Sequence, residues 1–462
     1  MKSQKISPIY ASQISHLSQP LFTGIWLRWE NLTQSEKVVC ACIILIPLWW
    51  LWGWSYLTIV LAISIFVYHY LHHGSLYLRP SLFVIAGFVV GLHELISISL
   101  WAVYNGYAVN TRGITSSIMV WIAPVAVLWY IQTYKIRARL QVVAWAFSVV
   151  VLMMLIFWAV IFFVWKQGVF VPPRSLFGLL TGKGEIFVPG MGNSNFLMPY
   201  FYTHRSIGGM ARYVFFFHGP ESFALVAGFL CLLALDIPHK VWSLSLFSSS
   251  FFLLLLSGTR AAWLVIPLVI SIRWLLTTGK DGRIWLVFAL LACLSFTTLS
   301  VPQVNDLLTQ SASTTASATS EFRADSTEVR GEIYRQTWKG FINGSDPQLI
   351  FGHVVPGETV LPGYAPAMVG THSFILSTLL YRKGLLGTAI FLNYWLSQIA
   401  WLYQTRYTRP ISCLLVYILF SLTFSSMEFE SMLMPLILIT AVTHKSLSPI
   451  SQQKKFAKVF SY

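Results

Sequence analysis

The most polar part of this apolar chain runs from Arg330 to Gly387, and it carries side chains that can do chemistry. Arg330 and Arg335 lie in its first segment, R-G-E-I-Y-R-Q-T-W, and His372 follows in T-H-S-F-I-L. A guanidinium group donates two parallel hydrogen bonds, which suits a phosphate group. A neutral imidazole can accept a proton from a hydroxyl group. These residue types predict a site where an anionic ligand lies beside a proton-accepting histidine.

Two further arginines are candidates for the same ligand. Arg260 lies in S-G-T-R-A-A-W-L, a predicted tight turn between two apolar segments. Arg212 lies in R-Y-V-F-F-F-H-G-P-E-S-F, and Glu221 of the same segment precedes another apolar run. Arginines held at membrane boundaries suggest an anionic ligand at that surface. We therefore predict that Arg212, Arg260, Arg330 and Arg335 bind the anion, and that His372 and Arg260 act in catalysis.

Each candidate also has a plainer interpretation. Arg260 can extend to lipid headgroups as an interfacial arginine. His372, at the start of an apolar segment, can simply cap a helix. The arginines of the polar segment can pair on a helix surface with Glu328 or Glu332.

The composition indicates which elements must position these residues. Of the 462 residues, 56% are hydrophobic and only 10% are charged, whereas soluble domains carry about 25% charged residues. An all-α polytopic membrane protein is therefore expected. The five cysteines fall inside apolar runs, so neither a disulfide framework nor a metal site is predicted.

Apolar runs of membrane-spanning length recur about twelve times along the chain. The first two form one long run, which we divide at Pro47 and Gly53 because a single helix of that length would overshoot the bilayer. The predicted spans are residues 38–52, 54–71, 81–104, 114–134, 140–165, 219–235, 241–257, 260–276, 283–302, 372–403, 410–426 and 429–444.

Basic residues predict the orientation of these spans. The short loops T-Y-K-I-R-A-R, G-K-D-G-R and T-R-Y-T-R fall on one side, which the positive-inside rule assigns to the cytoplasm together with both termini. The resulting plan is a cytoplasmic segment at 1–37, helices in 38–165, an outer loop at 166–218, helices in 219–302, a large outer loop at 303–371, helices in 372–444 and a cytoplasmic tail at 445–462.

The two outer loops differ in character. The loop at 166–218 is rich in Gly, Pro and aromatic residues, whereas the loop at 303–371 opens with a Ser/Thr/Ala tract, T-Q-S-A-S-T-T-A-S-A-T-S, that is expected to be mobile. In E-I-Y-R-Q-T-W-K-G-F, aromatic residues at positions 334, 338 and 341 have the spacing of an amphipathic surface helix.

Ionisable residues inside the spans are few. His93 and Glu94 lie near the middle of the third span, where such residues are functional candidates, but adjacent positions point to different helix faces. A buried, protonated Glu94 and a role in transport remain alternatives. The chain has no G-x-x-x-x-G-K-[ST], H-E-x-x-H or G-x-S-x-G motif, so any reaction is expected to use energy stored in its substrate.

The order of these motifs resembles the O-antigen ligase/polymerase superfamily. That family carries an S-R-small motif at a helix junction, then R-x-x-[IL]-[WY], a Gly-rich turn, H-[NS]-x-[FY]-L and G-L-L-G. This chain has S-G-T-R-A-A at Arg260, R-G-E-I-Y at Arg330, F-G-H-V-V-P-G at 351–357, H-S-F-I-L at His372 and G-L-L-G at 384–387. The segment at Arg212 resembles a further family motif, with Glu221 in place of Asn. The resemblance covers roughly residues 205–440.

The resemblance implies a fold like that of the GT-C glycosyltransferases and a site facing the periplasm of the bacterial inner membrane. The donor would be a glycan on undecaprenyl pyrophosphate, clamped by Arg212, Arg260, Arg330 and Arg335. His372 would orient or deprotonate the acceptor, a glycan or lipid A core. No cofactor, metal or nucleic acid is expected. Membrane lipid is expected as a partner.

Four functions remain open on this basis. The first is a ligase that moves the glycan onto an acceptor, and the second is a polymerase that extends it. A protein O-oligosaccharyltransferase would use the same donor and a different acceptor. A small-solute transporter fits less well, because only His93 and Glu94 lie near the middle of a span.

Overall fold

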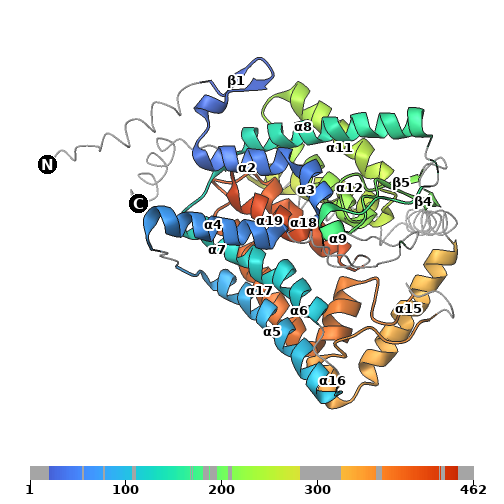
Figure 1. Ribbon diagram of the computed structural model, residues 1–462. Coiled ribbons are helices and arrows are strands. Elements are labelled where there is room, and N and C mark those ends of the chain that lie inside the picture. The colour runs from blue at the N-terminus through green and yellow to red at the C-terminus, as the bar shows by residue number, and fades with distance from the viewer. Residues whose placement is uncertain are drawn as a thin grey trace, which may run out of the picture.

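The computed structural model describes residues 20–54, 57–75, 79–106, 111–166, 168, 170–180, 187, 195–205, 211–280, 324–360, 367–425, 427 and 432–445. Within these residues the chain is mostly helical, with three small two-stranded sheets (Figure 1). This confirms the predicted all-α class. The predicted ninth span, 283–302, and the Ser/Thr/Ala tract at 309–320 lie outside the described residues.

The first half of the chain forms helices close to five predicted spans. These are α2 (Gln34–Ile44), α3 (Ile46–Trp52), α4 (Leu57–His73), α5 (Leu82–Tyr104), α6 (Thr111–Ser117), η3 (Ile118–Ile122), α7 (Ala123–Thr133), α8 (Leu140–Ala159) and η4 (Val160–Trp165). The division at Gly53 is confirmed, because Gly53 ends α3 with φ +107°. A second break falls at Leu45, where α2 and α3 meet at 59° with Pro47 in the first turn of α3.

The second half contributes the remaining described helices. These are α9 (Leu176–Leu180), α10 (Pro220–Ala234), α11 (Lys240–Leu256), α12 (Arg260–Lys280), α15 (Ala324–Ile342), α16 (Asp346–Phe351), η6 (Phe374–Lys383), α17 (Gly384–Gln404), α18 (Ser412–Thr423) and α19 (Leu433–Val442). The surface helix predicted around 332–341 is α15. Figure 1 shows it in orange, beside η6 and α16.

Five described helices are long and apolar enough to cross a membrane, and the bent pair α2–α3 would make a sixth. The five are Leu82–Tyr104, Gly113–Thr133, Leu140–Trp165, Arg260–Thr277 and Phe374–Gln404. The other apolar helices are only 10–17 residues long, whereas about 20 residues span a bilayer. The helical membrane character is therefore supported, and the count of twelve spans stays a prediction.

Helix α10 forms the centre of the core. Nearly all of its residues are buried, and α11, α12, α18 and α19 contact it. Small residues permit this close approach: a Cβ atom at Gly228 would lie 3.0 Å from Leu419 and 3.1 Å from Ile266. A helix that is apolar on every face belongs in the interior of a bundle.

Other helices expose an apolar face instead. Exposed leucine, isoleucine and valine side chains line the outer faces of the long helices; examples are Leu92, Leu100, Leu152, Ile156, Leu264, Leu268, Leu392 and Leu396. An exposed apolar surface of this extent fits contact with lipid chains rather than water.

Two of the sheets pair neighbouring segments, and the third connects distant parts of the chain. Strands β1 (Phe22–Thr23) and β2 (Trp26–Leu27) form a hairpin, β3 (Ala138–Arg139) pairs in parallel with β6 (Thr443–His444), and β4 (Tyr200–Arg205) pairs antiparallel with β5 (Ala211–Tyr213). Strand β5 lies just before α10, so this last pairing fixes Arg212 near the start of the central helix.

A buried ion pair holds the N-terminal helix. Glu36 accepts hydrogen bonds from Arg139 Nε at 2.6 Å and from Arg139 Nη2 at 2.7 Å, and it also closes the capping box with Thr33 at the start of α2. The Arg139 guanidinium further donates to the carbonyl of Asn31. This bidentate geometry pairs the two buried charges directly.

Candidate functional site

The tight turn between α11 and α12 presents Arg260. Ser257, Gly258 and Thr259 form the turn, and Arg260 is the first residue of α12. Gly258 has φ +65°, a left-handed conformation that glycine adopts without steric cost. The turn sets Arg260 at the helix start with a half-buried side chain.

Arg212 lies beneath this turn and fixes its shape. Its side chain is buried, with Nε donating to the carbonyl of Ser257 at 3.1 Å and Nη2 lying 3.5 Å from Thr259 Oγ1. Thr259 in turn donates to the carbonyl of Pro220 at 3.1 Å. Arg212 thus joins β5, the turn before α12 and the start of α10.

Glu221 supplies the negative charge of this cluster. Its carboxylate lies 3.3 Å from Arg212 Nη2, and it also interacts electrostatically with Arg330 of α15. Arg260 interacts with both Arg212 and Arg330. Electrostatic interactions therefore link three of the four predicted arginines, and two of them, Arg212 and Arg330, also act on Glu221. Three like charges with one counter-charge attract an anion.

Helix α15 connects this cluster to His372. Arg330 and Tyr334 are one turn apart on the helix, and the Tyr334 hydroxyl donates to the carbonyl of His372 at 2.9 Å. One turn further on, Thr337 Oγ1 accepts a hydrogen bond from the Gly370 amide at 2.9 Å. Residues at i, i+4 and i+7 share one face of a helix, so this face holds the 370–372 loop beside Arg330.

The backbone of His372 is held in an unusual conformation. Its φ is +67°, in the left-handed region that non-glycine residues rarely adopt. Such conformations persist where surrounding contacts determine them, and they are frequent at functional sites. The Tyr334 hydrogen bond is one such contact. Ser373, the next residue, caps η6 by accepting from the Leu376 amide.

A neighbouring hydroxyl selects the tautomer of His372. Thr371 Oγ1 donates its only hydrogen to the carbonyl of Met368 at 2.6 Å and lies 2.7 Å from His372 Nδ1. With that hydrogen used, the hydroxyl oxygen acts as acceptor, so Nδ1 carries the proton of the neutral ring. Nε2 then keeps its lone pair, which is the arrangement of a general base.

Arg335 lies away from the other predicted arginines. Its side chain is exposed and pairs with Glu332 on the surface of α15, the plainer of the two interpretations given above. Position 335 is also rotated by about 140° from position 330 around the helix, at 100° per residue. The structure thus does not bring Arg335 to the cluster.

Glu94, one of the two ionisable residues near the middle of the third predicted span, forms an ion pair that the sequence does not reveal. Glu94 Oε2 lies 2.7 Å from Nζ of Lys383, at the junction of η6 and α17. His93 packs against Gly387, where an added Cβ atom would lie 2.7 Å from the His93 ring. This pairing gives Glu94 a partner at the start of a neighbouring helix.

Sequence reasoning missed Tyr334 and Thr371 as parts of the site. The sequence signal for Tyr334 is its position four residues after Arg330, but its spacing with the aromatic residues at 338 and 341 predicts that it lies on the apolar face of the surface helix. Trp338 of that set is in fact exposed, whereas Phe341 is buried. Thr371 carried no signal beyond its position next to His372.

Within the described part of the chain, no group of three or more His, Cys, Asp or Glu side chains is placed to hold a metal ion. The guanidinium groups of the cluster are of a type that binds anions, and the imidazole of His372 is of a type that transfers protons. Comparison of the chain with protein-family models, with curated proteins and with solved structures found no match.

Proposed function

We propose that this protein is a membrane glycosyltransferase that moves a glycan from a lipid pyrophosphate, such as undecaprenyl pyrophosphate, to an acceptor hydroxyl. The observation that carries the proposal is the convergence of Arg212, Arg260 and Arg330 beside the loop that holds His372. A pyrophosphate would offset the mutual repulsion of the arginines, and a sugar attached to it would extend toward the histidine. The motif resemblance supports the same reaction.

In this reaction the arginines bind the donor and His372 accepts a proton. Arg260 and Arg330 contact the pyrophosphate, while Arg212, whose Nε and Nη2 bind protein groups, acts as a positioning residue for the turn that carries Arg260. His372 Nε2 accepts the proton of the acceptor hydroxyl. The hydroxyl oxygen bonds to the anomeric carbon as the bond from that carbon to the pyrophosphate oxygen breaks. The arginines stabilise the charge that grows on the leaving group.

The orientation supports an acceptor outside the cytoplasm. The proposed site lies at the α11–α12 turn and the loop before η6, while the basic loops at 134–139 and 405–409 lie at the other ends of these helix bundles. By the positive-inside rule the site then faces the periplasm of the inner membrane, and the termini lie in the cytoplasm.

The first experiment uses purified wild-type protein, Arg260→Ala and His372→Ala in detergent, with lipid-pyrophosphate-linked oligosaccharide and candidate acceptors. We expect joined product and free lipid pyrophosphate from the wild type, and a loss of about 100-fold or more in both variants. The exposed Arg335→Ala variant is the matched control and should keep its activity. Full activity in Arg260→Ala and His372→Ala would reject the site.

The product also separates two members of this reaction class. A single addition to a lipid A core or related acceptor indicates a ligase, whereas a ladder of lengthening glycans indicates a polymerase. The donor site is the same in both cases, because only the acceptor differs.

A further inference from the structure

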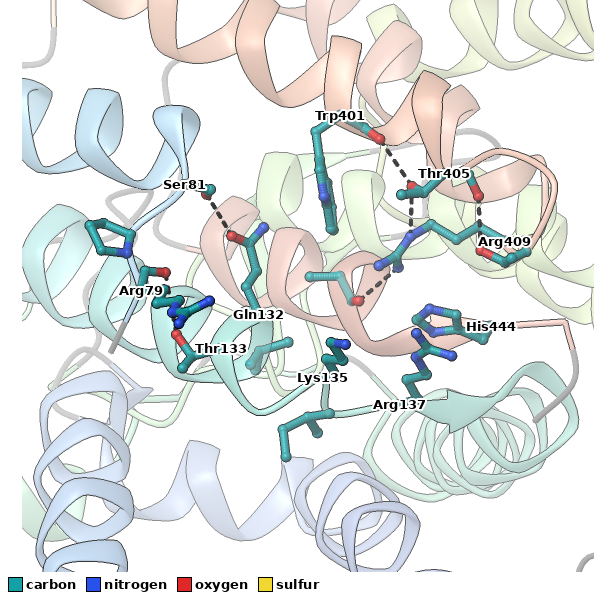
Figure 2. Close-up of a pocket in the computed structure, with 15 residues that line it drawn as sticks. Arg79, Ser81, Gln132, Thr133, Lys135, Arg137, Trp401, Thr405, Arg409 and His444 are labelled. Atoms are coloured by element: carbon teal, nitrogen blue, oxygen red, sulfur yellow. Dashed lines mark hydrogen bonds between the residues drawn. The ribbon is translucent and has the colours of Figure 1, made fainter. Parts of the chain in front are cut away.

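A second basic site lies at the opposite end of the helix bundle. It is a cavity of about 670 Å³ between the start of α5 and the ends of α7, α17 and α19 (Figure 2). Helices η6 and α17 run from His372 to this cavity over 31 residues, which corresponds to a separation on the order of 40 Å. The cavity is therefore distinct from the proposed catalytic site.

The charge of this cavity is of one sign. Four basic residues, Arg79, Lys135, Arg137 and Arg409, lie among its fifteen lining residues together with His444, and none of the fifteen is acidic. Figure 2 shows Lys135, Arg137 and His444 close to one another along the lower wall. Arg137 also interacts electrostatically with Arg409. Bringing these like charges together raises the energy of the empty cavity, and an anion lowers it.

Arg409 builds the wall of the cavity. It is buried, and its Nη1 donates to the carbonyls of Thr440 and Ala441 at 2.7 Å each, which closes the end of α19. Its guanidinium also lies 4.4 Å from the ring centre of Trp401. These contacts hold Arg409 in place, so it adds a positive charge at a fixed position in the cavity wall.

Other side chains are placed to contact a ligand. Lys135 is exposed and Arg137 is half-buried, and neither is paired with a carboxylate among the described residues. The amide of Gln132 accepts from Ser81 at 2.6 Å, while its buried Nε2 donor has no partner in the described part of the chain. A buried donor without a partner is costly, and an oxygen atom of a ligand would satisfy it.

We propose that this cavity binds a phosphate group, held by Lys135 and Arg137 with Gln132 as the neutral donor. The positive-inside rule alone explains basic residues on this face, but it requires neither a shared cavity nor an unpaired amide on its wall. Apolar groups from Ile131, Ile136 and Trp401 also line it, which suits a phospholipid headgroup at the membrane boundary. A soluble phosphate ester shares the chemistry.

The test compares two double variants of equal charge. Lys135→Gln/Arg137→Gln removes the proposed contacts. Lys240→Gln/Arg406→Gln removes the exposed Lys240 and the half-buried Arg406, two cations of the same predicted cytoplasmic side that do not line the cavity. Native mass spectrometry of the full chain in detergent counts bound phosphatidylglycerol against phosphatidylcholine. In a parallel arm, potassium phosphate replaces chloride at constant ionic strength while the thermal midpoint is followed by tryptophan fluorescence.

We expect the wild type and the control variant to retain one phosphatidylglycerol and the cavity variant to bind it at least tenfold more weakly. Stabilisation by inorganic phosphate alone, lost only in the cavity variant, would support the same site with a soluble source. Equal binding by all three proteins, or an equal loss in both double variants, would overturn the proposal, because the interaction would then not depend on this cavity.

Discussion

At the scale of single residues, Thr371 sets the protonation of His372. Thr371→Val keeps the size of the side chain but removes the acceptor for Nδ1–H, so the tautomer is no longer selected. Hydrogen bonds that orient metal-binding histidines contribute about 10–100-fold to activity, and we expect an effect of similar size for this histidine. We expect kcat to fall within that range while KM for the lipid-linked donor changes little. Steady-state kinetics check this, with Thr371→Ser as the variant that should restore kcat; an equal loss in Thr371→Ser would contradict the assignment.

His218 makes folding sensitive to acid. It precedes α10, and although part of its surface stays accessible, the surrounding protein lowers its pKa from 6.5 to about 4. Below pH 6.5 the unfolded chain therefore binds this proton more readily than the folded chain does, and stability falls as the pH drops toward 4. The thermal midpoint of the wild type should decline over this range more steeply than that of His218→Gln. Parallel pH profiles of the two proteins would show that another group is responsible.

The sequence identifies residue types better than it identifies their partners. The residue types of Arg260 and Arg330 and the motifs around them predict anion binding, and this stays a prediction. The contact between Arg212 and Thr259 joins positions 47 residues apart, and no local pattern encodes a contact of that range. Arg335 shows the opposite failure: it has the right chemistry, but helical geometry turns it toward Glu332.

At the scale of elements, the turn before α12 depends on Gly258. A Cβ atom there would lie 2.9 Å from Arg212 Cγ, and its φ is already positive. Gly74 is a matched control, because its φ is +68° with nothing within 4 Å. Left-handed backbone costs about 1–2 kcal/mol in either variant, so Gly258→Ala should lose more unfolding free energy than Gly74→Ala. Thermal or denaturant unfolding measures the difference, and equal losses would show that the Arg212 contact relaxes freely.

The Glu36–Arg139 pair should dominate the stability of α2. Glu36→Gln leaves a buried guanidinium without its counter-charge, which typically costs about 3–5 kcal/mol. The exposed Arg335–Glu332 pair provides the comparison, since Glu332→Gln should cost less than about 1 kcal/mol. Both variants can be measured by the same unfolding assay. Similar losses in the two variants would mean that Arg139 finds another partner.

At the scale of the whole molecule, apolar run length predicts where helices form but not how long they become. Each predicted span within the described residues contains a helix, yet α10, α18 and α19 are shorter than the runs that predict them. A hydrophobic run shows only that the segment avoids water. A helix buried inside the bundle and a helix buried in lipid therefore have the same hydropathy. Helix α10 illustrates this, because protein surrounds it on nearly every side.

The position of Arg139 has a consequence for the order in which the protein assembles. Arg139 binds Glu36 near the start of the chain, and its own strand β3 pairs with β6 near the end. During synthesis at roughly 5–20 residues per second, the first helix therefore waits on the order of 10 s before its counter-charge emerges. The parallel ladder closes only after His444 has left the ribosome. Through Arg139 and its strand, early, intermediate and late parts of the chain meet, so the β3–β6 contact beside the basic cavity can form only when synthesis is nearly finished.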